Sequence, residues 1–180
     1  MVIGITGAFG SGKSTAASFF VSKKYKLITL SSFLEEEVQN RNLPNTRKVL
    51  QDIGNEWRKD YGSGILAKKA IENTKNHKLI VIDGIRNIGE VEELRKSKNF
   101  ILVAVISDRA IRFNRIKNHK KREKLTWELF NKLDYRDLGL NEKSTGLQVA
   151  FCTAIADVYI ENNENIEVFK EKLEEFIKKI

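Results

Sequence analysis

Residues 7–14 of this 180-residue chain, Gly-Ala-Phe-Gly-Ser-Gly-Lys-Ser, match the phosphate-binding pattern G-x-x-x-x-G-K-Ser/Thr. Glycines in such a loop let backbone N–H groups close around phosphates, the lysine reaches the β- and γ-oxygens, and the hydroxyl ligates Mg²⁺. The pattern constrains the fold because the loop joins a strand to the positively polarised N-terminus of a helix. It predicts a nucleoside triphosphate site formed by Gly7, Phe9, Gly10, Ser11, Gly12, Lys13, Ser14 and Thr15.

The segments on either side of this phosphate loop (residues 7–14) fit that arrangement. The run from Val2 to Thr6 is apolar and rich in β-branched residues, which predicts a strand. A helix is expected from Lys13 to Val21, with apolar residues on its inner face. A plain glycine-rich turn that binds nothing would not need this order of strand, loop and helix, so the sequence favours the phosphate site.

Composition indicates one compact domain spanning residues 1–180. Hydrophobic residues make up 41% and charged residues 31%, which allows a full core without a bias toward disorder. The single cysteine, Cys152, excludes an internal disulfide and is typical of a reducing compartment. The first strand leaves no room for a signal peptide, and the longest apolar stretch, Phe100 to Ile106, is too short to span a membrane. We therefore expect a cytoplasmic protein without a membrane partner.

The formal net charge of +8 invites a nucleic-acid interpretation. Most basic residues are spread along the chain, and only Lys117 to Lys124 forms a dense cluster with a large excess of positive charge. Binding of a nucleic acid would favour aromatic residues interleaved with the basic ones, and this cluster has none. A small nucleotide would satisfy the cluster equally well, so we expect a small-molecule nucleotide partner, with the protein a monomer or a homodimer.

Apolar segments alternate with amphipathic ones along the chain, which predicts an α/β fold with a parallel sheet covered on both faces. The expected strands are Val2–Thr6, Lys26–Leu30, Lys78–Ile82, Phe100–Ile106 and Asp157–Glu161. Two insertions stand out from this repeat. They are a helical stretch over residues 33–76 and a basic stretch that continues into a helix over residues 117–136.

The helix expected from Asn45 to Tyr61 has two distinct faces. Its apolar face consists of Val49, Leu50, Ile53 and Trp57. The opposite face carries Arg47, Gln51, Gly54, Asn55 and Arg58. Arginine pairs with phosphate bidentately and amides read base edges or hydroxyls, which favours a substrate-binding face over a solvated one.

The third predicted strand runs directly into Asp83-Gly84-Ile85-Arg86. Functional groups of open α/β sheets lie at the carboxyl ends of strands, where Asp83 could hold Mg²⁺ and Arg86 could clamp a phosphoryl group. On a later helix, Arg112, Arg115 and His119 share one face. The two arginines there could stack on a nucleotide base or contact its phosphates.

These motifs resemble those of P-loop nucleoside and nucleotide kinases of the adenylate kinase and dephospho-CoA kinase group. More closely, the chain is similar to an archaeal-type set of small kinase-like proteins with a DGIR element and an aspartate-led final strand. The elements that match are the phosphate loop, Ile53 through Arg58 and Gly62, Val81 through Arg86, Arg112 with Arg115, and Ala156-Asp157 leading to Asn162. The resemblance implies a three-layer P-loop kinase fold with a five-stranded parallel sheet, an acceptor-binding insertion (33–76), a lid (117–136) and ATP with Mg²⁺.

The function predicted on these grounds is transfer of the γ-phosphoryl group of ATP to a (deoxy)nucleoside monophosphate. The expected catalytic residues are Lys13, Asp83, Arg86 and Arg122, and Ser14 and Asp83 would hold Mg²⁺. Arg112 and Arg115 would contact the donor nucleotide. The resemblance implies that Arg115 lies near the donor base. The acceptor would be held by Arg47, Gln51, Asn55, Arg58, Arg86 and Arg136.

Three alternatives differ from this prediction in substrate or class. A dephospho-CoA kinase would phosphorylate a hydroxyl and typically has an aspartate after the second strand, where this chain has Thr29-Leu30-Ser31-Ser32. Glu35 or Glu36 on the next helix could still supply a carboxylate. A regulatory GTPase would read guanine with Asn131-Lys132-Leu133-Asp134, but that string lies in a helical run instead of at a strand end. A nucleic-acid-linked ATPase would need aromatic residues among the basic ones of Lys117 to Lys124, and this cluster has none.

Overall fold

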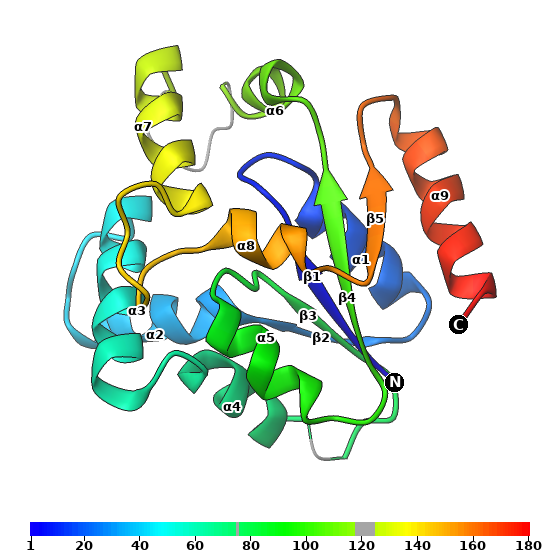
Figure 1. The fold of residues 1–180 in the computed structure, drawn as a ribbon, viewed down its shortest axis with the longest axis horizontal. Helices are drawn as coiled ribbons and strands as arrows, with labels where there is room; N and C mark the ends of the chain where they lie inside the picture. Colours follow the sequence, from blue (N-terminus) through cyan, green and yellow to red (C-terminus); the bar gives the residue numbers. More distant parts are fainter. Residues whose placement is uncertain (75, 118–124) are drawn as a thin grey trace.

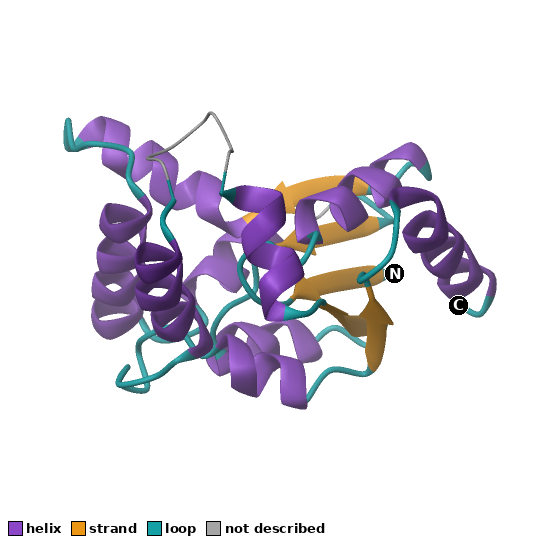
Figure 2. Ribbon diagram, turned by 90° about the horizontal axis from the view of Figure 1, so that it is seen from above, coloured by secondary structure: helices purple, strands orange, loops and turns teal. Residues whose placement is uncertain are grey.

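The computed structural model describes residues 1–74, 76–117 and 125–180. Its centre is one parallel sheet with the strand order β2-β3-β1-β4-β5 (Figure 1). The strands are β1 (Val2–Thr6), β2 (Lys26–Thr29), β3 (Ile80–Asp83), β4 (Phe100–Ile106) and β5 (Val158–Glu161). Helices cover both faces of this sheet (Figure 2), so the predicted three-layer α/β fold with five parallel strands is confirmed.

Three strands, β2, β3 and β5, differ from the sequence prediction by one or two residues at one or both ends. Strand β2 stops at Thr29 because Leu30 already begins the next helix. Strand β3 extends to Asp83, which pairs in register with Ile5 of β1. Strand β5 begins after Asp157, whose carboxylate accepts a hydrogen bond of 2.8 Å from the backbone N–H of Leu102.

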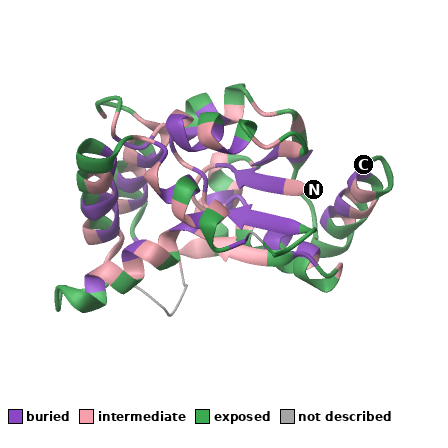
Figure 3. Cartoon of the chain, turned by 90° about the horizontal axis from the view of Figure 1, so that it is seen from below, coloured by how far each residue is buried: buried purple, intermediate pink, exposed green. Residues whose placement is uncertain are grey.

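One face of the sheet is packed by α1 (Lys13–Ser22) and α9 (Ile166–Lys178), as their shared core cluster shows. Phe169, Leu173 and Phe176 of α9 are buried there. The other face is covered by α5 (Ile88–Arg95) and α8 (Val149–Ala154), together with the helical insertion. Figure 3 shows buried strands between these outer helices.

The insertion consists of α2 (Leu30–Asn40), α3 (Arg47–Tyr61) and α4 (Ile65–Glu72). Helix α3 begins two residues later than predicted because Thr46 caps it, accepting a hydrogen bond from the backbone N–H of Val49. Its apolar residues Leu50 and Ile53 enter the main core as expected. Three residues of the predicted polar face, Gln51, Gly54 and Arg58, are buried as well, so much of that face is enclosed by protein.

Helices α6 (Arg109–Ile116) and α7 (Trp127–Leu138) lie beyond the carboxyl end of β4, over the phosphate loop (Figure 1). The string 131–134 lies inside α7, as expected, and not at a strand end. Residues 118–124, which include the predicted Arg122, lie outside the described part of the chain. Among the described helices, none combines the length and apolar character that crossing a membrane requires.

Candidate active site

The phosphate loop follows β1 and ends where α1 begins. Gly7, Gly10 and Gly12 adopt φ angles of 141°, 80° and 105°, which side-chain-bearing residues rarely tolerate. A Cβ atom on Gly7 would lie 2.3 Å from the carbonyl oxygen of Val105. Only glycine fits there, and the resulting loop places the N-terminal backbone N–H groups of α1 beside the site, where they favour an anion.

The Lys13 side chain folds back on the phosphate loop. Its Nζ donates hydrogen bonds of 2.6 Å and 3.0 Å to the carbonyl oxygens of Gly7 and Ala8. Burial lowers the pKa of Lys13 to about 8, although the neighbouring carboxylates of Asp137 and Asp83 favour the charged form. A bound polyphosphate would supply the negative charge that this ammonium group needs.

Asp83 ends β3 next to the phosphate loop. It is 7% exposed, and burial raises its pKa, while the charges of Lys13 and Arg86 act in the opposite direction. The Ser14 hydroxyl hydrogen-bonds the carboxyl group, and the Oδ1 atom of Asp83 has no hydrogen-bond partner among the described residues. A hydroxyl and an orphaned buried carboxylate oxygen at a phosphate loop are oxygen ligands of the kind that Mg²⁺ prefers, so the residues fit this ion.

A cavity of about 520 Å³ opens over the loop, within the range of about 300–1,000 Å³ typical of ligand pockets. The loop residues that line it are Phe9, Gly10, Gly12, Lys13, Ser14 and Thr15. Side chains from other elements complete the lining, among them Thr29, Glu35, Arg47, Asp83, Arg86 and Arg115. Gly7 and Ser11 shape the loop beneath this donor cavity, where the Ser11 carbonyl accepts a 2.8 Å hydrogen bond from Asn162.

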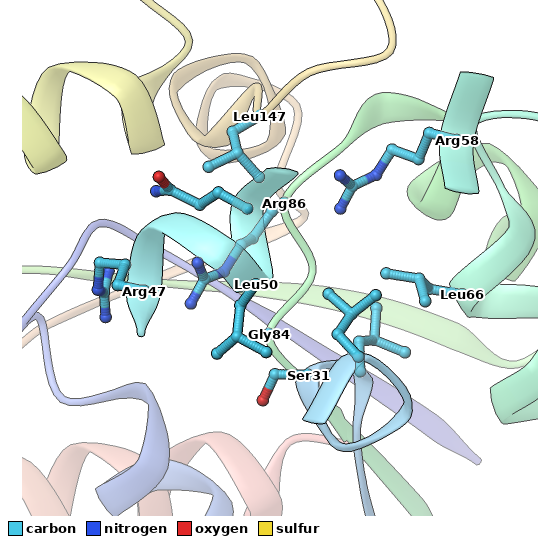
Figure 4. Close-up of a pocket in the computed structure, with 11 residues that line it drawn as sticks. Ser31, Arg47, Leu50, Arg58, Leu66, Gly84, Arg86 and Leu147 are labelled. Atoms are coloured by element: carbon cyan, nitrogen blue, oxygen red, sulfur yellow. The ribbon is translucent and has the colours of Figure 1, made fainter. Parts of the chain in front are cut away.

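A second, smaller recess adjoins the donor cavity (Figure 4). We call it the acceptor recess. It lies between α2, α3 and the segment after β3, and its lining includes Leu30, Leu34, Leu50, Gln51, Arg58, Leu66 and Leu147. Ser31, Arg47, Gly84 and Arg86 line both spaces, so the two meet at a pair of arginines. This junction is where a group could pass from one bound molecule to the other.

The two junction arginines are held by contacts on opposite sides. Arg86 donates a hydrogen bond of 3.0 Å from Nη1 to Oδ1 of Asp137 in α7. The Arg47 guanidinium lies over the Phe9 ring, 3.4 Å from the ring centroid, which joins α3 to the phosphate loop. Both contacts orient cationic groups toward the space above Lys13.

Asp137 is a buried anion that the sequence prediction missed. It is 0% exposed. Burial raises its pKa, yet the positive charges of Arg86, Arg47 and Lys13 outweigh this effect and hold the pKa below its usual value. A signal existed in the sequence: residues 130, 133, 134 and 137 have the spacing of a buried helical stripe, and the last two are aspartates.

Arg58, predicted to contact substrate, forms a buried ion pair. Its Nε and Nη2 donate hydrogen bonds of 3.0 Å and 2.8 Å to Oε1 of Glu90, which is 0% exposed. The other Glu90 oxygen accepts from the backbone N–H groups of Arg86 and Asn87. Arg58 thus helps to fix the loop after β3 and still presents Nη1 to the acceptor recess.

Arg112 supports the phosphate loop instead of facing the donor cavity. It is 5% exposed, and Nη1 and Nη2 bind the carboxylate of Asp134 while Nη1 also donates a 2.9 Å hydrogen bond to the carbonyl of Phe9. Arg115 does line the donor cavity, and it donates a 2.8 Å hydrogen bond to the carbonyl of Asn162. The sequence analysis expected both arginines to contact the donor, but of the two only Arg115 lines the donor cavity.

Arg136 and Asn55 lie away from both spaces. Arg136 pairs with Asp52 and with Glu142, at 2.8 Å in each case, and Asn55 donates to Glu142 at 2.9 Å. Neither residue is among the described side chains that line the donor cavity or the acceptor recess. Their network instead ties α3 to α7 and to the segment after it, so in this conformation they are connectors between elements.

Two solved structures share the fold at low sequence identity. A shikimate kinase from Acinetobacter baumannii, in complex with shikimate, has a TM-score of 0.60 and 14% identity, with 98% of this chain and 90% of that one covered. A gluconokinase from Sinorhizobium meliloti has a TM-score of 0.59 and 11% identity, with coverage of 99% and 91%. At these identities the likeness establishes the fold alone.

Sequence comparison establishes the family. Residues 3–138 match the AAA_18 family model, described as an AAA domain. The UPF0200 protein of Sulfurisphaera tokodaii is 34% identical over 180 residues, an alignment that covers 99% of this chain and 97% of the relative. Because both matches extend over most of the chain, this protein belongs to the AAA_18 domain family and to the UPF0200 proteins.

Proposed function

We propose that this protein is a phosphotransferase that moves the γ-phosphoryl group of ATP to the phosphate of a (deoxy)nucleoside monophosphate. The observation that carries the proposal is that the donor cavity, which Lys13 lines, meets the acceptor recess at Arg47 and Arg86. The fold shared with small-molecule kinases and the resemblance of the DGIR segment to nucleotide kinases support the same reaction class.

The donor side of the reaction needs positioned charge rather than covalent chemistry. Lys13 now donates to two loop carbonyls and would instead donate to the β- and γ-phosphate oxygens of bound ATP. The backbone N–H groups of the loop would hold the remaining phosphate oxygens. Ser14 and Asp83 would hold Mg²⁺, which would neutralise negative charge on the phosphates. Arg115 would lie near the donor base. Asp137 keeps Arg86 oriented toward the transferred group.

The acceptor side is cationic at its entrance. Arg47 and Arg86 would bind the acceptor phosphate between them, close to the end of the donor polyphosphate. A phosphate acceptor is already anionic and needs no general base, which agrees with the serines at positions 31 and 32, in the first turn of α2 after β2. Closure of the region around α6 and α7 would exclude water during transfer.

One observation favours a second candidate, a kinase for a hydroxyl acceptor such as dephospho-CoA. Glu35 of α2 lines the donor cavity together with Ser31, so a carboxylate is available near the junction to take a hydroxyl proton. The solved kinases with this fold are named for hydroxyl-bearing substrates, shikimate and gluconate. The two candidates differ in what happens when Glu35 is removed, because only a hydroxyl acceptor needs the base.

The deciding measurement is ADP release from Mg-ATP with a panel of ribo- and deoxynucleoside monophosphates, dephospho-CoA, shikimate, gluconate and an acceptor-free control. We expect turnover with a monophosphate as acceptor. Glu35→Gln should change this turnover rate by no more than about threefold, and Lys13→Ala should abolish turnover. Lys68→Ala, at an exposed position of α4, is the matched lysine control. Turnover only with a hydroxyl acceptor, lost in Glu35→Gln, would overturn the proposal in favour of the second candidate.

A further inference from the structure

The acceptor recess contains hydrogen-bonding groups that no protein atom satisfies. Gln51 is 3% exposed, and neither its amide oxygen nor its amide nitrogen has a hydrogen-bond partner within the described chain. Arg58 is equally buried, and its Nη1 also lacks one. Buried polar groups in native proteins are nearly always paired. Two unsatisfied side chains in one recess therefore indicate that a ligand completes them.

The Nη1 atom of Arg58 is a fixed donor. Glu90 holds the other two guanidinium nitrogens at 3.0 Å and 2.8 Å and is itself fixed by backbone N–H groups. Nη1 lies over Gly54, where a Cβ atom would come within 3.2 Å of it. Gly54 is one helical turn after Gln51, so the guanidinium reaches back toward the amide. Figure 4 shows the Arg58 guanidinium directed into the recess from the end opposite Arg47.

The order of these groups fits the edge of a pyrimidine ring. Arg58 Nη1 can only donate, whereas the Gln51 amide offers one donor and one acceptor in either orientation. Uracil and thymine present carbonyl, N–H and carbonyl in sequence, and cytosine presents carbonyl, ring nitrogen and amino group. Either edge pairs fully with an arginine donor followed by an amide. Adenine can offer N1 to the arginine and its amino group to the amide oxygen, but it then leaves the amide N–H of Gln51 without an acceptor. The edge of guanine ends on two donors, and the second of these meets the amide N–H.

The size and walls of the recess support a single ring. Its volume is about 60 Å³, space for roughly four to six water-sized spheres, which suits one six-membered ring better than a fused pair. Leucines line the recess around the polar stripe, among them Leu34, Leu50 and Leu66, and they would cover the faces of a flat ring. The phosphate of the same molecule would reach Arg47 and Arg86 at the other end.

We propose that this recess reads a pyrimidine base, so that the acceptor is a pyrimidine nucleoside monophosphate, with Gln51 and the Nη1 of Arg58 as its specificity groups. This inference rests on the proposed function. It adds a base class that neither the fold nor the family membership specifies. Gln51 acts here on substrate choice and not on the transfer of the phosphoryl group.

The test compares CMP, UMP and dTMP with AMP and GMP as acceptors, by ADP release and by calorimetric binding without ATP. We expect kcat/KM at least about tenfold higher for a pyrimidine than for either purine. Gln51→Leu should raise the KM for that pyrimidine about 10- to 100-fold with little change in kcat or in ATP affinity. Gln39→Leu, on the exposed side of α2, is the matched control and should match wild type.

The variant is expected to fold, because it removes a buried polar group that had no partner. If Gln51→Leu does not fold, the nucleotide panel on the unaltered protein still decides whether the recess selects pyrimidines. Purines accepted as well as pyrimidines, or an unchanged pyrimidine KM in folded Gln51→Leu, would overturn the inference while leaving the proposed function intact. Turnover with no monophosphate at all would overturn both.

Discussion

At the scale of single residues, the charges around Lys13 are balanced for a ligand that brings negative charge. Lys13, Arg47 and Arg86 face Asp83 and Asp137 across a small buried space. Burial destabilises the charged forms of Lys13 and Asp83, and the opposite charges compensate only in part, as the lowered pKa of Lys13 and the raised pKa of Asp83 show. The site is therefore poised to gain stability when phosphates and Mg²⁺ arrive.

We expect the stability of the nucleotide-free protein, relative to Lys13→Met, to rise with pH. Below about pH 8 the folded protein carries the buried ammonium and its full desolvation cost. From there to 10.5 the unfolded chain binds more protons at this residue than the folded protein does, so the wild-type free energy of unfolding increases. The gain should reach at most about 3 kcal/mol.

Urea unfolding of both proteins across this pH range measures the difference. Lys68→Met provides the control, since Lys68 is exposed on α4 and its substitution should give a difference that stays constant with pH. A constant difference for Lys13→Met as well would contradict the buried, proton-releasing state of the lysine.

Asp137→Asn should destabilise the nucleotide-free protein by about 3–5 kcal/mol, because it leaves Arg86 and its neighbours without their buried counter-charge. Saturating Mg-ATP should close part of that gap, since phosphates then supply the missing negative charge. Thermal unfolding with and without Mg-ATP tests this, with exposed Asp60→Asn as the control. An equal loss under both conditions would mean that Asp137 acts only on packing.

At the scale of elements, helix α3 connects the acceptor recess to the rest of the site through two arginines with different surroundings. Arg58 is 3% exposed and tied to Glu90, which in turn holds the backbone after β3. Arg47 begins the helix and stacks on Phe9 of the phosphate loop. One end of α3 therefore supports the frame of the site, and the other end faces the place where the two substrates would meet.

Alanine at these two positions should reduce stability to different extents. Arg58→Ala leaves Glu90 buried without its cation and should cost about 3–5 kcal/mol of unfolding free energy. Arg47→Ala removes an edge contact worth about 1 kcal/mol but should raise the acceptor KM more than tenfold. Urea unfolding and steady-state kinetics on both variants give the comparison. If Arg47→Ala proves the more destabilising, the assignment of the two ends of α3 is wrong.

The sequence predicted elements whose signal is local. Strands β1 and β4 have the predicted bounds, because hydrophobic periodicity depends on neighbouring residues. Glu90 and Asp137 were not predicted, since their partners lie 32 and 51 residues away along the chain. A sequence shows that a residue is charged but does not show that it is buried or which distant residue pairs with it. Both become visible once the fold brings distant elements together.

At the scale of the whole molecule, the parallel sheet brings two predicted phosphate-binding segments to one edge. The phosphate loop follows β1, and the segment from Asp83 to Arg86 follows β3, its direct neighbour. The donor cavity and the acceptor recess open at this edge and share Arg47 and Arg86. Part of the chain's excess positive charge therefore lies in this site, because both spaces are lined by arginine or lysine side chains that can bind phosphates.

A molecule that occupies both spaces at once should bind more tightly than either half. We expect a dinucleoside polyphosphate, with adenosine joined through five phosphates to a pyrimidine nucleoside, to compete with ATP and with the acceptor, since its phosphate chain would pass Arg47 and Arg86. At one hundred times its Kd it should stabilise the fold by about 2.7 kcal/mol, a Tm increase of roughly 5–10 °C. Arg86→Ala should weaken this compound more than it weakens ATP, because only the compound spans the junction. Competition with ATP alone would place the acceptor outside the recess, and the continuity of the two spaces would then have no part in the reaction.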